Sequence, residues 1–171
     1  MNKKIAVVAL MAGALLLAGC NQQGKDEAAK PAASETAAPA TALVAPPADD
    51  ERAWKLYLVN VAKSHLDGIR SSPYMYYLPS AAAEDFQEQY ERQRDNVAGA
   101  VFRGVLPGNM LAFGSPESGR MADLIVDAFE GVSPGSMKDV RVLFIGAPED
   151  LDRVKAAIEP TGANVVFHEV K

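Results

Sequence analysis

The clearest chemical signal is the segment Gly114-Ser115-Pro116-Glu117-Ser118-Gly119-Arg120, which follows a short apolar run. Its Gly-x4-Gly spacing between a predicted strand and a predicted helix is that of a phosphate-binding loop. Such a loop continues with Lys and then Ser or Thr, whereas Arg120 and Met121 stand here, and Glu117 places negative charge where a phosphate would lie. The segment does not predict nucleotide binding. Its remaining interpretation is a small-anion site at a helix N-terminus, formed by Ser115, Ser118 and Arg120.

The same serines follow the carboxyl end of a strand, where open α/β sheets place their active sites. A serine nucleophile needs a general base, and the sequence offers His65 and His168. His65 falls on an apolar helical stripe, a position more typical of a core histidine than of a catalytic one, and His168 lies in the last predicted strand, where an exposed edge position is expected. An enzyme would require one of them within hydrogen-bond distance of a loop serine. The sequence therefore favours a non-enzymatic protein, with a small enzyme or ligand-binding protein using the loop 114–120 as the alternative.

The net charge and the small number of potential metal ligands argue against two further classes of protein, nucleic-acid binders and metalloproteins. The 171 residues carry a net charge of −5, whereas nucleic-acid binders present a basic face. The His65-x-Asp67 pair supplies two potential metal ligands that do not face the same way, although a protein metal site needs three or four. We therefore expect no metal, no cofactor and no nucleic acid.

A tyrosine-rich segment, Tyr74-Met75-Tyr76-Tyr77, is the least ordinary part of the chain. Aromatic side chains with a polar tip are enriched at contact surfaces. One interpretation is a partner-binding loop formed by Arg70, Tyr74, Tyr76 and Tyr77. The other is that alternate members of the segment pack inward as a lid over the sheet.

The N-terminus contains an export signal. Lys3 and Lys4 precede an uncharged apolar run from Ile5 to Leu17, which is too short to span a bilayer. The run leads into Leu17-Ala18-Gly19-Cys20, which resembles the lipobox of bacterial lipoproteins. The resemblance covers the first twenty residues and implies that Cys20 becomes the acylated first residue of the mature chain.

The lipoprotein resemblance also implies a location and a kind of partner. Acylated Cys20 would hold the chain on the membrane, with the rest of it in the periplasm. Asn21 stands where an inner-membrane protein of enteric bacteria would carry Asp, which favours the outer membrane. We expect the partner to be another envelope protein or a component of the cell wall.

Composition divides the chain into a signal peptide (residues 1–19), a lipidated Cys with an Ala/Pro-rich tether (20–48) and a globular domain (49–171). Between residues 21 and 47 the large apolar residues are Leu43 and Val44 alone, so this stretch cannot bury enough surface to offset chain entropy. Prolines at 31, 39, 46 and 47 also interrupt any long helix.

Hydrophobic periodicity predicts two helices at the start of the domain. The first begins after Asp49 or Asp50, ends by Gly68 and buries a stripe at three-four spacing. The second begins at a Ser80 N-cap and continues to about Arg103, with residues 69–79 as a loop between them. The stripe of the first helix comprises Trp54, Tyr57, Leu58, Val61, Ala62 and Leu66.

The second half of the domain contains a repeated strand-exit device. Gly114-Ser-Pro-Glu and Gly146-Ala-Pro-Glu each follow an apolar run and open a helix, with a last strand at 165–167. The order strand–helix–strand–helix–strand predicts three parallel strands with both crossover helices on one face. The two N-terminal helices are then expected to cover the other face. The predicted fold is a small three-layer α/β domain.

Overall fold

The computed structural model describes residues 43–171, so the signal peptide, Cys20 and most of the tether lie outside the described residues. Two short 3-10 helices, η1 (Pro148–Asp150) and η2 (Glu159–Thr161), flank the last α-helix. In chain order the other elements are α1 (Glu51–Lys63), β1 (Tyr74–Tyr77), α2 (Phe86–Arg103), β2 (Met110–Gly114), α3 (Ser118–Phe129), β3 (Arg141–Gly146), α4 (Leu151–Ile158) and β4 (Asn164–Glu169).

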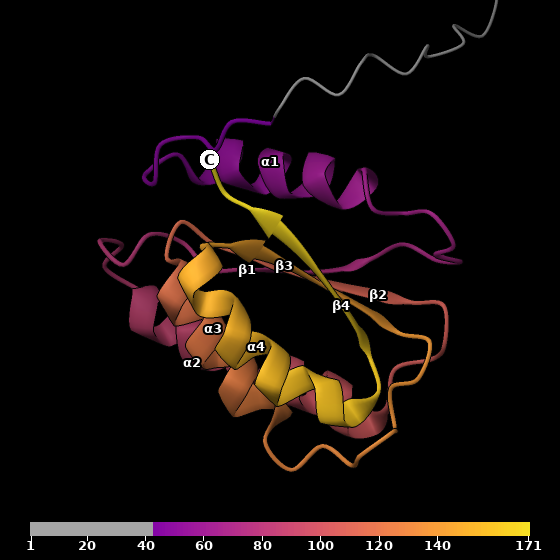
Figure 1. Ribbon diagram of the computed structural model, residues 1–171. Helices are drawn as coiled ribbons and strands as arrows, with labels where there is room; N and C mark the ends of the chain where they lie inside the picture. Colours follow the sequence, from indigo (N-terminus) through magenta and orange to yellow (C-terminus); the bar gives the residue numbers. More distant parts are fainter. Residues whose placement is uncertain (1–42) are drawn as a thin grey trace, which may run out of the picture. The chain divides into compact units, whose positions relative to one another are not determined.

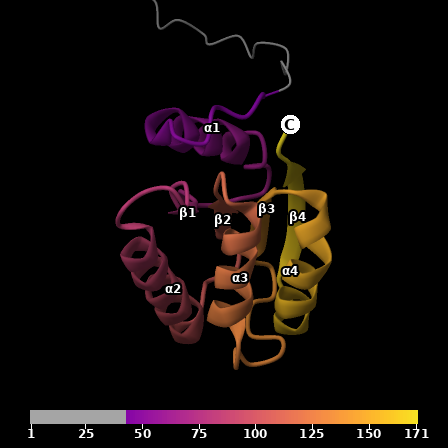
Figure 2. The ribbon, with the colours of Figure 1, turned by 90° about the vertical axis from the view of Figure 1, so that its left-hand side faces the viewer.

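The four strands form one parallel sheet in the order β1-β2-β3-β4. Each strand is joined to the next by a helix, and these three helices, α2, α3 and α4, lie on the same face (Figure 1). Helix α1 lies alone on the opposite face, as the perpendicular view also shows (Figure 2). The parallel α/β class and the three layers predicted from the sequence are confirmed.

The strand count and the cover of the second face differ from the prediction. Residues Tyr74–Tyr77 were expected in a loop but pair with β2, in the register Tyr74–Leu111 to Tyr77–Gly114. This extra strand makes α2 a crossover between β1 and β2. Since successive crossovers of one hand place their helices on one face, α2 lies beside α3 rather than beside α1. The prediction that two N-terminal helices cover the second face is therefore wrong.

The sheet separates two apolar cores. The larger core lies under α2, α3 and α4 and contains Phe113, Phe144 and the buried stripe of α3. The smaller core lies under α1, where Trp54, Tyr57 and Leu58 pack on alternate residues of β2 and β3. Strands β2 and β3 are buried almost throughout, as central parallel strands covered on both faces must be.

The predicted helix starts hold for α1 but not for the next two helices. Asp50 caps α1, accepting a hydrogen bond from the Ala53 N–H at 2.9 Å. Helix α2 begins at Phe86, because Ser80 caps only a local turn in which its Oγ accepts from Ala82 N at 3.3 Å. Helix α3 begins only at Ser118, after the Gly114-Ser-Pro-Glu turn that was expected to open it.

Packing extends N-terminal to the predicted domain boundary at Asp49. Leu43 and Ala45 pack against the smaller core. The Ala45 N–H donates to the Lys171 carbonyl at 2.8 Å, beside the end of β4. The last residues of the predicted tether are thus part of the folded domain.

Candidate functional site

The predicted anion loop lies at the carboxyl edge of the sheet, where its two serines are used to join turns. Ser115 is 1% exposed, and its Oγ accepts from the Glu117 N–H at 2.9 Å. Ser118 Oγ accepts from the Ala147 N–H at 2.8 Å and donates to Asp150 Oδ2 at 2.6 Å. The two strand-exit turns seen as a repeat in the sequence are therefore linked through Ser118.

The charges around this loop oppose an anion. Asp150 is nearly buried and accepts from Arg153 Nε at 3.1 Å as well as from Ser118. Glu117 projects to the preceding loop and accepts from the Ala81 N–H at 2.9 Å. Asp123 also pairs with Arg153. The carboxylates of Glu117, Asp123 and Asp150 therefore connect neighbouring segments at this edge of the sheet.

Arg120 also points away from the proposed anion position. Its guanidinium lies 4.4 Å from the Tyr90 ring centroid and 5.8 Å from that of Phe86, and it pairs with Asp123 at 3.5 Å. Stacking on α2 fixes the side chain against the neighbouring helix. Ser115 and Ser118 thus hydrogen-bond within and between the turns, and Arg120 stacks on α2, so all three side chains of the predicted anion site have partners within the domain.

The two histidines meet each other, which the sequence did not predict. His65, just beyond α1, and His168, on β4, have ring centroids 5.9 Å apart, and Tyr57 lies 6.3 Å from His168. Within residues 43–171 neither imidazole hydrogen-bonds Ser115 or Ser118, so the arrangement that a serine nucleophile needs is not formed there.

Both histidines have a lowered pKa. Burial is the main cause for each; the Arg141 charge adds to it for His65, and the charges of His65 and Lys171 add to it for His168. A histidine whose pKa is lowered on folding binds its proton more weakly in the native state than in the unfolded chain. Its contribution to stability is full above the unfolded pKa of about 6.5 and decreases as the pH falls below it.

We therefore expect acid to loosen the contact between α1 and β4. Urea unfolding of the full chain between pH 7.5 and pH 5 should show stability falling with pH more steeply in the wild type than in the His65→Gln/His168→Gln variant. The variant serves as the control because it retains every carboxylate that titrates in the same range. Equal pH slopes for the two proteins would contradict the prediction.

The structure separates the tyrosines of the predicted partner-binding segment. Tyr76 is 8% exposed and stacks on Phe113 in the larger core, with ring centroids 4.9 Å apart. Tyr77 lies on the α1 side, where its hydroxyl is buried without a partner and burial raises its pKa to about 12. Tyr74 remains 50% exposed. Tyr76 and Tyr77 thus pack on opposite faces of the sheet, in which the segment is a strand rather than a lid, and Tyr74 is left as the surface residue.

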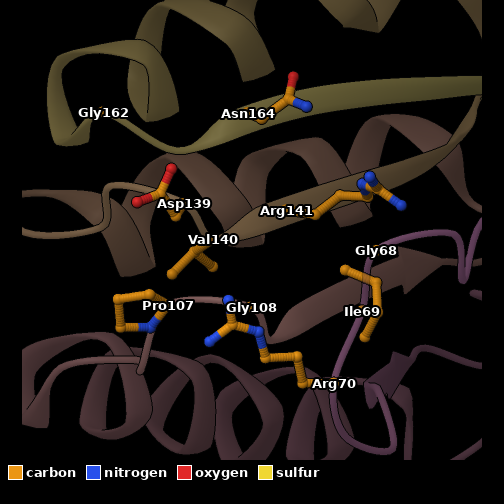
Figure 3. Close-up of a pocket in the computed structure, with 10 residues that line it drawn as sticks. All are labelled: Gly68, Ile69, Arg70, Pro107, Gly108, Asp139, Val140, Arg141, Gly162 and Asn164. Atoms are coloured by element: carbon orange, nitrogen blue, oxygen red, sulfur yellow. The ribbon is translucent and has the colours of Figure 1, made fainter.

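A hollow lies at the opposite, amino edge of the sheet. It encloses about 570 Å³ and is lined from the turn before β1 and from the starts of β2, β3 and β4 (Figure 3). Arg70 lies here, rather than beside the tyrosines with which it was grouped, together with Asp139, Arg141 and Asn164. The sequence did contain a signal for this pocket. Pro107-Gly108 and Asp139 each precede a strand, and the residues that precede successive parallel strands gather at one edge of the sheet.

Residues 43–171 contain no group of three or more His, Cys, Asp or Glu side chains that could hold a metal ion. In the same residues, no helix combines the length and the apolar character needed to cross a bilayer.

These features define a small parallel α/β domain with a polar pocket at the amino edge of its sheet. No protein-family model matches the chain, and no curated protein sequence or solved structure is significantly similar to it.

Proposed function

We propose that this chain is a lipid-anchored protein of the bacterial cell envelope whose α/β domain binds another envelope protein. The anchor is Cys20, on the strength of the Leu17-Ala18-Gly19-Cys20 motif behind a charged and apolar leader. The domain faces the periplasm, with the outer membrane favoured by Asn21. The turn-joining roles of Ser115 and Ser118 support binding rather than catalysis.

The observation that carries the binding function is the apolar surface beside β1. Leu106 is 74% exposed and Tyr74 50%, although most other large apolar side chains of the domain are buried. Tyr74 and Leu106 line a common hollow of about 240 Å³. We call Tyr74 and Leu106 the β1-edge face. Exposed aromatic and aliphatic residues that share a hollow are typical of protein-binding surfaces.

Strand β1, at the edge of the sheet, offers a partner a way to bind through its main chain. Among residues 43–171, strand β1 pairs with β2 alone, so its outer side faces no other strand of the described sheet. An extended segment of another protein can add to such an edge through main-chain hydrogen bonds, with side-chain pockets giving specificity. The partner we propose is an envelope protein that presents an extended apolar segment to β1.

The anchor is tested by metabolic labelling with an alkyne fatty acid. The wild-type chain should carry the label and fractionate with the outer membrane, and Cys20→Ala should lose both properties. An unlabelled wild type, or a labelled Cys20→Ala protein, would overturn the anchor.

The binding surface is tested by a photo-reactive amino acid placed at Tyr74 or Leu106 of the full chain in cells. We expect a discrete cross-linked protein from these positions and none from Asp152, which is exposed on α4. A Leu106→Ser variant should lose the Tyr74 cross-link while its urea unfolding stays unchanged, because the Leu106 side chain already faces water. Cross-links that survive this variant would refute the surface.

A further inference from the structure

The pocket at the amino edge of the sheet has the size of a small-molecule site and carries charge of both signs. Its volume of about 570 Å³ lies within the range of roughly 300–1,000 Å³ typical of ligand pockets. Two arginines and one aspartate line it, in a chain whose net charge is −5. The pocket is thus locally cationic on an acidic protein.

Arg141 is held in place before any ligand arrives. Its Nη1 donates to the His65 carbonyl at 2.5 Å and to the Asp67 carbonyl at 2.9 Å, both in the turn after α1. Within residues 43–171 the guanidinium makes no ion pair and its Nη2 makes no hydrogen bond. A planar guanidinium fixed in this way retains donors for a carboxylate at little further loss of side-chain entropy.

Arg70 reaches the pocket because Gly108 has no side chain. A Cβ on Gly108 would lie 3.0 Å from Arg70 Cδ, and the backbone there has φ +83°, which favours glycine. The Arg70 N–H donates to the Gly108 carbonyl at 2.9 Å, which anchors the main chain beneath the side chain. Within the described residues the Arg70 guanidinium makes no hydrogen bond or ion pair.

Asp139 supplies the opposite charge on the other side of Gly108. Its carbonyl accepts from the Gly108 N–H at 2.7 Å, so Arg70, Gly108 and Asp139 lie on three adjacent chain segments. At the usual strand spacing this places the Arg70 and Asp139 backbones about 10 Å apart. Asp139 is the one non-glycine residue in residues 43–171 with positive φ, at +61°, and its carboxylate has no partner there.

We propose that this pocket binds a short peptide or amino acid that carries both carboxylate and ammonium groups. Carboxylates of the ligand pair with the guanidinium groups of Arg70 and Arg141, and its ammonium pairs with Asp139. The Asn164 amide offers a neutral donor and acceptor in the same pocket. A simple anion such as phosphate would instead meet the unpaired charge of Asp139, so the charge pattern selects against it.

The proposal is tested by isothermal titration calorimetry on the full-length lipoprotein in detergent, with three probes. The dipeptide Gly-Glu carries two carboxylates and one ammonium, N-acetyl-Gly-Glu lacks the ammonium, and inorganic phosphate is the simple anion. We expect saturable binding of Gly-Glu, at least about tenfold weaker binding of the acetylated form, and no competition by phosphate.

Two variants test which side chain of the pocket pairs with which charged group of the ligand. Arg70→Gln should weaken Gly-Glu binding at least about tenfold, because it removes a charge-assisted pair. Asp139→Asn should abolish the preference for Gly-Glu over its acetylated form, and Asn tolerates the positive φ at this position. Arg52→Gln, exposed on α1 and outside the pocket, is the charge-matched control and should bind as the wild type does.

Absence of saturable Gly-Glu binding would overturn the proposal, as would equal binding of phosphate or wild-type affinity in Arg70→Gln. Matching urea unfolding of Arg70→Gln, Asp139→Asn and the wild type would show that lost binding is not lost folding. Neither outcome depends on the β1-edge face, which lies on other residues.

Discussion

Replacing Phe144 by Ala is expected to lower the free energy of unfolding by about 3–5 kcal/mol, the usual cost of removing a fully buried ring. Phe144 is completely buried in the larger core and stacks on Phe167, with ring centroids 6.0 Å apart. In the middle of β3, Phe144 pairs with Phe113 of β2 and with Phe167 of β4. The cavity that Ala would leave therefore cannot close without disturbing the sheet. Urea unfolding of the full chain, followed by far-ultraviolet circular dichroism, gives the value.

Phe102→Ala is the matched control for this prediction. The same ring is removed, but Phe102 is 87% exposed and its loss should change stability by no more than about 0.5 kcal/mol. If the two phenylalanine variants proved equally stable, the core described under α2, α3 and α4 would be incorrect.

A single methyl group at Gly114 is expected to cost about 1–3 kcal/mol, because it would overfill the smaller core. A Cβ at this position would overlap Leu58 Cδ2 of α1 and lie 3.2 Å from Ile145 Cβ of β3. The missing side chain of Gly114 therefore leaves the space that Leu58 of α1 occupies against the sheet. Thermal unfolding of Gly114→Ala should show a lower midpoint than the wild type, whereas Gly99→Ala on α2 should stabilise by up to about 1 kcal/mol.

The clash at Gly114 can be tested against its named partner. In a Leu58→Ala background the added methyl group gains the space vacated by Leu58, so Gly114→Ala should cost less than it does alone. Additive costs in the double variant would show that the two residues do not meet. Such additivity would place α1 differently on the sheet.

The elements predicted well were those whose burial pattern is local. The stripe of α1 repeats at three-four spacing, and Trp54, Tyr57 and Leu58 are buried as that spacing requires. Strands β2 and β3 are short apolar runs that end at Gly114 and Gly146, which also identified them. In each case one segment contains the whole signal.

Strand β1 and the pocket depend instead on pairing between distant segments. The four residues of β1 lie between Pro73 and Pro79 and became a strand through their pairing with β2. The lining of the pocket comes from the starts of separate strands, so no local motif joins Arg70 to Asp139. Ser115 and Ser118 showed the reverse, because a local motif suggested an anion site, whereas the hydrogen bonds of both serines depend on how the turns fold.

The hydrogen bond between Ala45 and Lys171 has a mechanical consequence for a protein proposed to be tethered. Tension in the tether enters the domain beside the end of β4, whereas the proposed partner is held at β1, and these strands are the two edges of the sheet. A pull between anchor and partner is then carried sideways through the ladders β1·β2, β2·β3 and β3·β4 rather than along any one strand. The burial of β2 and β3 on both faces reinforces the two strands that such a load must cross.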